Sequence, residues 1–474
     1  MTRTAAVVAS LLLVVSSLSN GRTAAAVQPV GSAPNVLLIQ ADDLGYGDLS
    51  AYGQSRFQTP ALDRLARQGT RFTQYYAGST VCAPSRAALM TGMHTGHGWI
   101  RGNGSLPDGD VPLRPDDVTM AEVLRDSGYR TAIIGKWGLG QPGTTGQPNK
   151  QGFDYAFGFL DQRHAHRQFT DHLWRNGEQV PTDLDRDYAN DLFTKEAATF
   201  IERSDPRPFF VYLNYTVPHA ELRVPDDSLE PFRGKFAERP FANPAADGTP
   251  TGARPDGPSL GYRSQPQPHA AFAAMITRMD RDVGRLVDLL VQRGIDRRTL
   301  VLFFSDNGPH QEGGGDPVFF KSAGGLRGIK RDLYEGGIRV PMIARWTGVV
   351  PAGRVSNHVW AHWDVLPTLA AVTGARAPAG LDGLSMAAAL RGESQATHPF
   401  FYWEFHERGF QQAVRMERWK AVRLTPGTPL ELYDLDADPN EEHNIAAANA
   451  GVVTRIENYL KTARTNSERW PGKS

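Results

Sequence analysis

Two acidic pairs come directly after short apolar runs that are typical of buried β-strands. Asp42 and Asp43 end the segment "NVLLIQADD", and Asp306 and Asn307 end "TLVLFFSDN". Neighbouring carboxylates repel each other unless a cation compensates them, and ligands that are all oxygen atoms suit Ca²⁺ or Mg²⁺. Asp and Asn are also common in turns, but two such pairs at strand ends favour a divalent metal site.

The chain has a single cysteine, Cys82, in the segment "TVCAPSRAALMTG". Pro84 suits the first turn of a helix, so Cys82 is expected at a helix N-terminus, where free N–H groups favour an anion. Arg86 lies on the same face of that helix, and Lys136 and Lys330 are further candidate cations. This pattern predicts a site for a tetrahedral oxyanion such as phosphate or sulfate. The alternative is a buried structural thiol.

Other polar residues that could contact a substrate lie close to the ends of apolar runs. His219 follows "FFVYLNYTVP", and the segment 159–177 concentrates histidines and arginines, five of which lie close together in sequence. These are Arg163, His164, His166, Arg167 and His172. Loops of this kind suit sugar hydroxyls, and a solvated surface loop explains the same composition equally well.

The elements that must position these residues alternate along the chain. Runs rich in β-branched and aromatic residues predict strands over 35–40, 131–135, 209–215, 299–305 and 339–346. Helices are predicted from Pro60, from the capping box at Thr119, and over 270–292. This order predicts an α/β fold with a mainly parallel central sheet between helices, in which ligands lie beyond the carboxyl ends of the strands.

The pattern changes after about Gly392. The segments "FYWEF", "QQAVR", "KAVRL" and "LELYDL" predict antiparallel strands, and a polar helix is expected from about Ala446. We therefore expect a catalytic domain over 33–391 and a smaller C-terminal α+β subdomain with an antiparallel sheet over 392–474. The Pro- and Gly-rich segment 238–268 is expected to be a long surface insertion or a disordered loop.

The N-terminus and the charge balance bear on location and partners. Residues 1–26 contain Arg3 and a short apolar run, which predicts a signal peptide and a secreted or periplasmic mature protein. No segment is apolar and long enough to predict a membrane span. The chain has 51 Lys+Arg and 51 Asp+Glu, so no basic excess indicates nucleic-acid binding. A single cysteine also excludes an intrachain disulfide.

Taken in order along the chain, these motifs resemble those of the sulfatases. "CAPSR" matches the Cys-x-Pro-Ser-Arg core of that family, and "ADD", "SDNG" and "EGGIRVP" resemble its other signature segments. The resemblance covers nearly all of the mature chain and implies an alkaline-phosphatase-like fold. In arylsulfatase-type members a separate maturation enzyme oxidises the cysteine to formylglycine, whose hydrate attacks sulfur.

The resemblance also implies a role for each matching residue. Arg86 would hold the hydrate, Lys136 and Lys330 would bind sulfate oxygens, and His219 would protonate the leaving oxygen. The implied calcium ligands are Asp42, Asp43, Asp306, Asn307 and the modified Cys82. The expected function is hydrolysis of a sulfate ester, with a sulfated carbohydrate as the leading substrate, and a galactose or N-acetylgalactosamine sulfate within that class. The oligomeric state is left open.

One position departs from the family's pattern. The chain has "GKWGLG" where many sulfatases have "GKWHLG", so Gly138 stands in place of a histidine assigned to the hydrate. His94 and His97, expected on the helix after Cys82, and His310 are candidate replacements, although His97 fits better as an ordinary polar histidine. The expected substrate contacts are Arg163, His164, His166, His94 and His310.

Two other functions remain open at this point. Relatives with the same cysteine motif include phosphodiester and phosphonate ester hydrolases. Gly138 is also consistent with a catalytically silent relative that only binds carbohydrate.

Overall fold

The computed structural model describes residues 1–2, 33–104, 110–247 and 261–472. Residues 33–474 form one compact unit. The predicted signal peptide lies outside the described residues except for its first two positions, and it stays a prediction. The predicted insertion over 238–268 is described up to Asp247 and again from Gly261, and it contains the short helix α6 (Pro244–Asp247).

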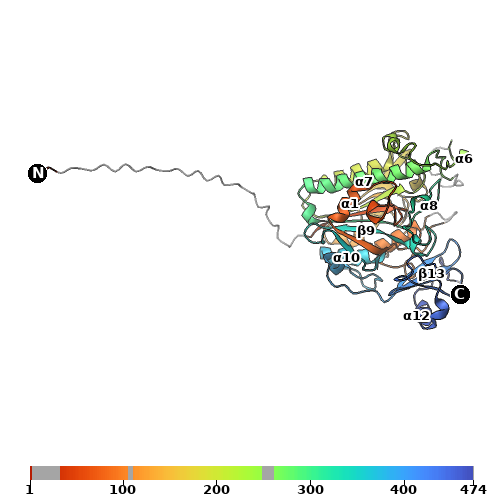
Figure 1. Cartoon of the computed structure of the whole chain (residues 1–474). Coiled ribbons are helices and arrows are strands. Elements are labelled where there is room, and N and C mark those ends of the chain that lie inside the picture. The colour runs from red at the N-terminus through yellow and green to blue at the C-terminus, as the bar shows by residue number, and fades with distance from the viewer. Residues whose placement is uncertain (3–32, 105–109, 248–260, 473–474) are drawn as a thin grey trace. The chain divides into compact units, whose positions relative to one another are not determined.

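The centre of the fold is a mixed sheet whose five neighbouring middle strands are parallel, which confirms the predicted sheet (Figure 1). In sheet order they are β8 (Thr299–Ser305), β1 (Asn35–Asp42), β7 (Phe209–Pro218), β3 (Arg130–Lys136) and β4 (Tyr155–Phe159). Leu38 of β1 lies opposite Tyr212 of β7 and Leu302 of β8. Because parallel strands run the same way, their carboxyl ends meet at one edge of the sheet.

Shorter strands extend this sheet on both sides. Next to β8 lie β9 (Arg339–Arg345), β2 (Thr70–Tyr76), β10 (Arg354–Ser356) and β11 (Trp360–Ala361), and next to β4 lie β5 (His172–Arg175) and β6 (Glu178–Pro181). The strand predicted over 339–346 is present as β9, but it runs antiparallel to β8 and β2. The sheet is therefore mainly rather than wholly parallel.

Two hydrophobic cores lie on the two faces of the sheet, because successive side chains of a strand point to opposite faces. Leu37 and Ile39 belong to one core, and Val36 and Leu38 belong to the other. Helices α1 (Pro60–Arg67), α4 (Ala189–Glu202) and α7 (Pro268–Gln292) cover the first face. Helices α2 (Cys82–Thr91), α3 (Met120–Asp126), α10 (Val365–Thr373) and α11 (Ala387–Arg391) cover the second.

The helix that begins at Cys82 is shorter than the motif suggested. Helix α2 ends at Thr91, and Gly92 follows with a φ of 70° and donates its N–H to Ala88 O. A left-handed glycine is a common helix C-terminus because it has no Cβ to clash. His94 and His97 therefore lie beyond the helix, which corrects the expectation that they continue it.

The C-terminal part forms a separate antiparallel sheet, as predicted, but shares a core with the large sheet. Its strands are β12 (Phe401–Phe405), β13 (Gln411–Met416), β14 (Trp419–Arg423) and β15 (Glu431–Asp434), and helix α12 (Ala450–Leu460) follows. Trp403 packs with Tyr76 and Val81 and donates its Nε1–H to Ala77 O at 2.9 Å. Lys420 Nζ lies 3.0 Å from Glu335 Oε1 and 3.3 Å from Glu441 Oε1, and all three side chains are buried.

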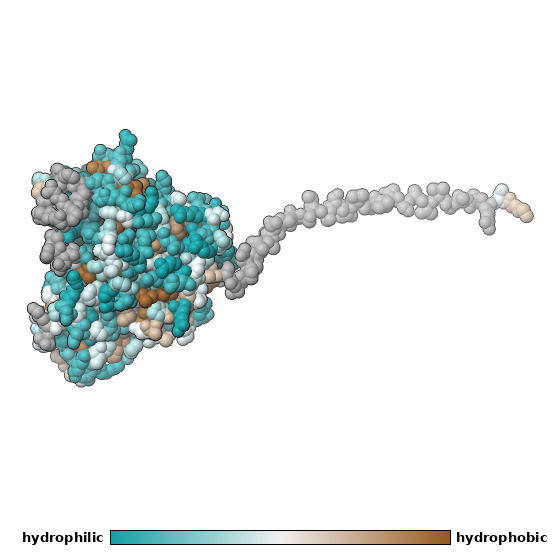
Figure 2. Space-filling view, turned by 180° about the vertical axis from the view of Figure 1, so that it is seen from behind, coloured by the Kyte–Doolittle hydropathy of each residue, from teal (hydrophilic) through white to brown (hydrophobic). Residues whose placement is uncertain are grey.

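Short helices in connecting segments complete the described chain: η1 (Ser50–Tyr52), η2 (Pro148–Lys150), η3 (His164–His166), α5 (Asp226–Leu229), η4 (Glu230–Phe232), η5 (Asp296–Arg298), α8 (Pro317–Phe320), α9 (Glu335–Ile338), η6 (His362–Asp364) and η7 (Ala446–Ala448). No described helix is both long and apolar enough to cross a membrane. The face drawn in Figure 2 is mainly hydrophilic, with hydrophobic residues in small separate groups.

Candidate active site

Residues predicted from separate segments meet at the carboxyl edge of the parallel strands. Asp42 ends β1, Asp306 follows β8, His219 follows β7, and Lys136 ends β3. Lys330 reaches the same place from the segment before α9, and Cys82 from the first turn of α2. All of these side chains are buried. The strand order β8–β1–β7–β3 explains why positions far apart in sequence become neighbours.

Asp43 contacts polar side chains from three other segments of the chain. Its Oδ1 accepts from Asn307 Nδ2 at 2.6 Å, and its Oδ2 accepts from Lys330 Nζ at 2.8 Å. His219 Nε2 lies 3.3 Å from the same Oδ2. The residue has a φ of 64°, a conformation that is unfavourable for a residue with a Cβ and that recurs at functional sites.

A second group of charges lies around Asp42 and Asp306. Lys136 Nζ donates to Asp42 Oδ2 at 2.7 Å, and Arg86 donates to Asp306 Oδ2 from Nη2 at 2.8 Å and from Nε at 3.1 Å. Burial and the charge of Asp42 raise the pKa of Asp306, although Arg86 opposes the shift. Arg86 also donates Nη1–H to the main-chain oxygen of Lys136 at 2.8 Å, which ties α2 to β3.

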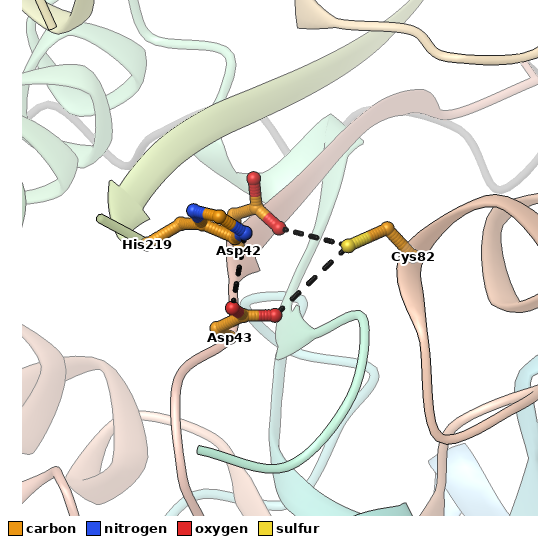
Figure 3. Close-up of side chains that lie close together, drawn as sticks. All are labelled: Asp42, Asp43, Cys82 and His219. Carbon is orange, nitrogen blue, oxygen red and sulfur yellow. Dashed lines mark hydrogen bonds and ion pairs between the residues drawn. The ribbon is translucent and has the colours of Figure 1, made fainter. Parts of the chain in front are cut away.

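Cys82 lies beside both Asp42, which ends β1, and Asp43, which follows it (Figure 3). Its Sγ is 3.6 Å from Asp42 Oδ1 and 4.0 Å from Asp43 Oδ1, at the first residue of α2. Burial raises the pKa of the Cys82 thiol well above its ordinary value, while Lys136 and Lys330 act in the opposite direction. An unmodified thiol here is therefore protonated at neutral pH, and thiols react as thiolates.

His219 is a neutral imidazole with both nitrogens engaged. Nδ1 must donate to the carbonyl of Ala220, at 2.6 Å, which leaves Nε2 to accept from Lys330 Nζ at 2.9 Å. Burial, then Lys330 and Lys136, hold the pKa of His219 well below its usual range. The ring stacks on His166 at a centroid distance of 4.5 Å and on His310 at 5.4 Å.

Glu312 also belongs to this cluster, although sequence reasoning missed it. Its Oε2 lies 3.4 Å from Lys330 Nζ and 3.6 Å from His219 Nε2, and its Oε1 accepts from Arg331 Nη1 at 2.6 Å. Burial alone would raise the pKa of Glu312, but Lys330 and His219 lower it well below its usual range. Tyr262, from the Pro- and Gly-rich segment, donates to Oε2 at 3.0 Å. Glu312 comes two residues after "SDNGPH" in the sequence, and this closeness is the signal that could have identified it.

The oxygen atoms of this cluster fit a divalent cation. Three buried carboxylates, Asp42, Asp43 and Asp306, are paired with three buried cations. The cations are Lys330, Lys136 and Arg86. The charges of the cluster therefore balance, and a further cation is needed to attract an anionic ester. Asn307 Oδ1 is buried and has no hydrogen-bond partner among the described residues. Carboxylate and amide oxygens are the ligands that Ca²⁺ prefers.

The predicted substrate contacts divide into two groups. The structure brings His166 and His310 to His219. His94 lies past the far end of α2, about 14 Å along the helix from Cys82, and its ring stacks on His97. The ring of His164 is hydrogen bonded to Thr170 at 2.7 Å. The positive charge of Arg163 acts on Asp110, where it opposes the rise in pKa that burial causes.

The side chain of Gln162 lies against Gly138. A Cβ at position 138 would lie 1.8 Å from Gln162 Nε2, and Gly138 has a φ of 74°. Gln162 is buried and lies 3.3 Å from the main-chain oxygen of Gly138 through Nε2. The carboxamide of Gln162 therefore fills the space into which a side chain at position 138 would extend.

Comparison with protein families decides the class of this site. Residues 34–375 match the family model described as Sulfatase. The chain belongs to the sulfatase family. Residues 329–466 also match the model described as N-sulphoglucosamine sulphohydrolase, C-terminal, which spans the end of the large sheet and the antiparallel sheet. This sulfatase is accordingly a sulfuric ester hydrolase.

Several characterised proteins are similar to this sulfatase over most of its length. N-acetylgalactosamine-6-sulfatase of Canis lupus familiaris is 31% identical, with 97% of this chain and 85% of the relative covered. Human arylsulfatase A is 32% identical, with 91% and 87% covered. The structure of Ps i-CgsB in complex with k-i-k-neocarrahexaose has a TM-score of 0.76 at 28% identity, covering 94% of this chain and 96% of that chain.

The phosphonate alternative is supported only by a shared fold. Phosphonate monoester hydrolase of Agrobacterium radiobacter has a TM-score of 0.65 at 23% identity, covering 93% of this chain and 99% of that chain. The relatives described above are sulfatases by name.

Replacing Glu312 with glutamine is expected to lower kcat/KM for a sulfate ester about tenfold, because a charged contact to Lys330 and His219 becomes a neutral one. Steady-state kinetics measures the effect. Glu407→Gln is the matched control, since Glu407 pairs with Arg331 at 2.9 Å but does not contact Lys330. An equal loss in both variants would show that only the Arg331 contact matters.

Proposed function

We propose that this sulfatase removes sulfate from carbohydrate esters after export, with formylglycine formed from Cys82 and a bound Ca²⁺. The observation that carries the proposal is the position of Cys82. The only thiol of the chain lies at a helix N-terminus, within 4.0 Å of two carboxylates that are themselves paired with Lys136 and Lys330. A structural cysteine needs none of these charged neighbours, whereas a nucleophile that attacks an anionic ester does.

The proposed calcium ligands are the oxygens of Asp42, Asp43, Asp306 and Asn307, together with the modified Cys82. A cation there would neutralise the carboxylates and attract the oxygens of the sulfate group. Mg²⁺ is the second candidate, since it accepts the same oxygen ligands. Arg86 orients Asp306 and opposes the rise in its pKa, and Asn307 has an amide oxygen without a hydrogen-bond partner among the described residues.

The aldehyde hydrate of formylglycine would supply the attacking oxygen and a route for sulfate to leave. The protein's own side chains would bind the sulfate group and move the proton. Lys136 and Lys330 hold the sulfate oxygens by charge, since each is buried and can exchange part of its contact with a carboxylate for the substrate. His219 is neutral and its Nε2 accepts from Lys330 Nζ, so His219 would take a proton from that ammonium group and pass it to the leaving oxygen.

The substrate class is supported by the names of the similar proteins. Relatives named N-acetylgalactosamine-6-sulfatase occur in dog and, at 28% identity, in Bacteroides thetaiotaomicron, where that enzyme is called N-acetylgalactosamine-6-O-sulfatase. The Ps i-CgsB structure contains a neocarrahexaose. We therefore place sulfated galactose and N-acetylgalactosamine first among the sugars to be tested. Steryl-sulfatases are also similar, at 27% identity for the human protein, so aryl and steryl sulfates belong in the same panel.

Mass spectrometry of the peptide that contains Cys82 tests the nucleophile. In active protein, matured by a formylglycine-generating enzyme, we expect the thiol to be replaced by an aldehyde or its hydrate. Cys82→Ala is expected to reduce sulfate ester hydrolysis to background while the unfolding temperature stays close to that of the wild type. Fully active protein with an unmodified Cys82 thiol would refute this part of the proposal.

Export rests on the sequence of the first 26 residues, with its short apolar run. N-terminal sequencing of protein secreted by its natural host or a related one is expected to begin after this segment. A mature protein that retains Met1 would contradict a cleaved signal peptide.

A further inference from the structure

One histidine at the site has no partner for either ring nitrogen. His166 ends η3, and its backbone is fixed because its oxygen accepts from Glu221 N at 2.9 Å and its N–H donates to Arg163 O at 3.1 Å. Its ring lies against the ring of His219 at 4.5 Å and 15°, and against Tyr262 at 5.2 Å. Among the described residues, no hydrogen bond involves its Nδ1 or Nε2.

The other histidines nearby are already engaged. His310 donates Nε2–H to Pro218 O at 3.0 Å and accepts from Glu312 N through Nδ1 at 3.0 Å. His219 uses both nitrogens, as described above. Polar groups of this kind normally have partners, so the two free nitrogens of His166 are available to a bound molecule. The residue is only partly buried, so a ligand can reach it.

The charge of its surroundings determines what His166 can bind. Burial, then His219, Lys136 and Lys330, hold the pKa of His166 well below its usual range, so the ring is neutral. A neutral imidazole offers one N–H donor and one acceptor. Lys136 and Lys330 supply the positive charges that match a sulfate group, and a neutral ring adds no charge to theirs. A hydroxyl, which also donates and accepts, is the complementary partner.

We propose that His166 binds a free hydroxyl of the substrate close to the carbon that bears the sulfate ester, and so selects sulfated sugars over simple aryl sulfates. The assignment rests on the proposed function, because it requires a carbohydrate ester at this site. Because His219 is proposed to protonate the leaving oxygen, a hydroxyl bound beside His219 would belong to the leaving sugar. Tyr262 offers an aromatic face to the same sugar.

The test compares His166→Phe with His166→Gln. Phenylalanine keeps the stacked ring without hydrogen bonds, and glutamine keeps a donor and an acceptor. In a Cys82→Ala background, which binds without turnover, calorimetry measures Kd for the monosulfated sugar that the wild type hydrolyses fastest, and for its deoxy analogues that each lack one hydroxyl. His443→Asn, which removes an exposed imidazole, is the control.

We expect one deoxy analogue to bind about tenfold more weakly than the parent sugar to the Cys82→Ala protein. With His166→Phe added, the parent and this analogue should bind equally. His166→Gln should restore part of the discrimination. A Phe variant that weakens all ligands equally, or none, overturns the assignment. A wild type that hydrolyses aryl sulfates but no sugar sulfate overturns the proposed carbohydrate function itself.

Discussion

Replacing Asp43 with asparagine is expected to lower kcat/KM for a sulfate ester by about a thousandfold or more. The buried carboxylate is the counter-charge of Lys330 and the neighbour of His219 and Cys82. The neutral amide leaves Lys330 without its closest anion and removes a proposed calcium ligand. Steady-state kinetics with a reactive aryl sulfate measures the loss.

Asp280→Asn is the matched control for this variant. Asp280 is also a buried aspartate, and it accepts from the N–H groups of Ala61 and Leu62 at the start of α1. It lies in α7, on one face of the sheet, away from the carboxyl edge of the strands. Its variant should lose stability and keep its kcat/KM. An Asp43→Asn protein with nearly normal turnover would contradict the role of this carboxylate.

Gly138→His is expected to destabilise the protein and lower turnover, because the side chain of Gln162 has to move to make room for a Cβ. The left-handed backbone at position 138 costs about 1–2 kcal/mol for a residue with a Cβ, and the Cβ would overlap Gln162 Nε2 at 1.8 Å. Chemical denaturation should give a lower free energy of unfolding. In Gly138→His/Gln162→Ala the overlap is absent, so part of the lost stability and some activity should return.

Gly128→Ala separates the two causes. Gly128 has a φ of 90°, yet no atom lies within 4 Å of a Cβ built there. Gly128→Ala should lose only the free energy of unfolding that the left-handed backbone costs, and Gly138→Ala should lose clearly more free energy of unfolding. If both alanine variants lose the same amount, Gln162 does not occupy the space of residue 138 in solution.

The strands and most of the site could be predicted because both depend on local patterns. β1 and β8 are short apolar runs that fit strands buried on both faces, and their reactive residues follow directly at the carboxyl ends, where sheet topology must bring them together. The capping box at Thr119 and the proline at the start of α1 likewise appear as predicted. In each case a few neighbouring residues carry the whole signal.

Glu312, Tyr262 and Gln162 could not be found in this way, because loops place them. Tyr262 reaches the site from a Pro- and Gly-rich segment whose path depends on contacts with Glu312 and His166. Gln162 matters only because β4 runs beside β3, which puts it against Gly138. The prediction that the helix continues to His94 and His97 was wrong for a different reason: Gly92 ends α2, while the family motif continues past it.

The buried contact of Lys420 with Glu335 and Glu441 ties the antiparallel sheet, which carries Lys420, to helix α9, which begins at Glu335. Glu335 begins α9, a few residues after Lys330, and the pKa of Glu335 is held at about 2: burial would raise it, but Lys420 and Arg339 outweigh burial. A chain truncated after Arg391 would lack Lys420 and leave this carboxylate buried without its nearest cation, at a cost of about 3–5 kcal/mol. The antiparallel sheet thus supplies the cation that holds the chain in place a few residues after Lys330.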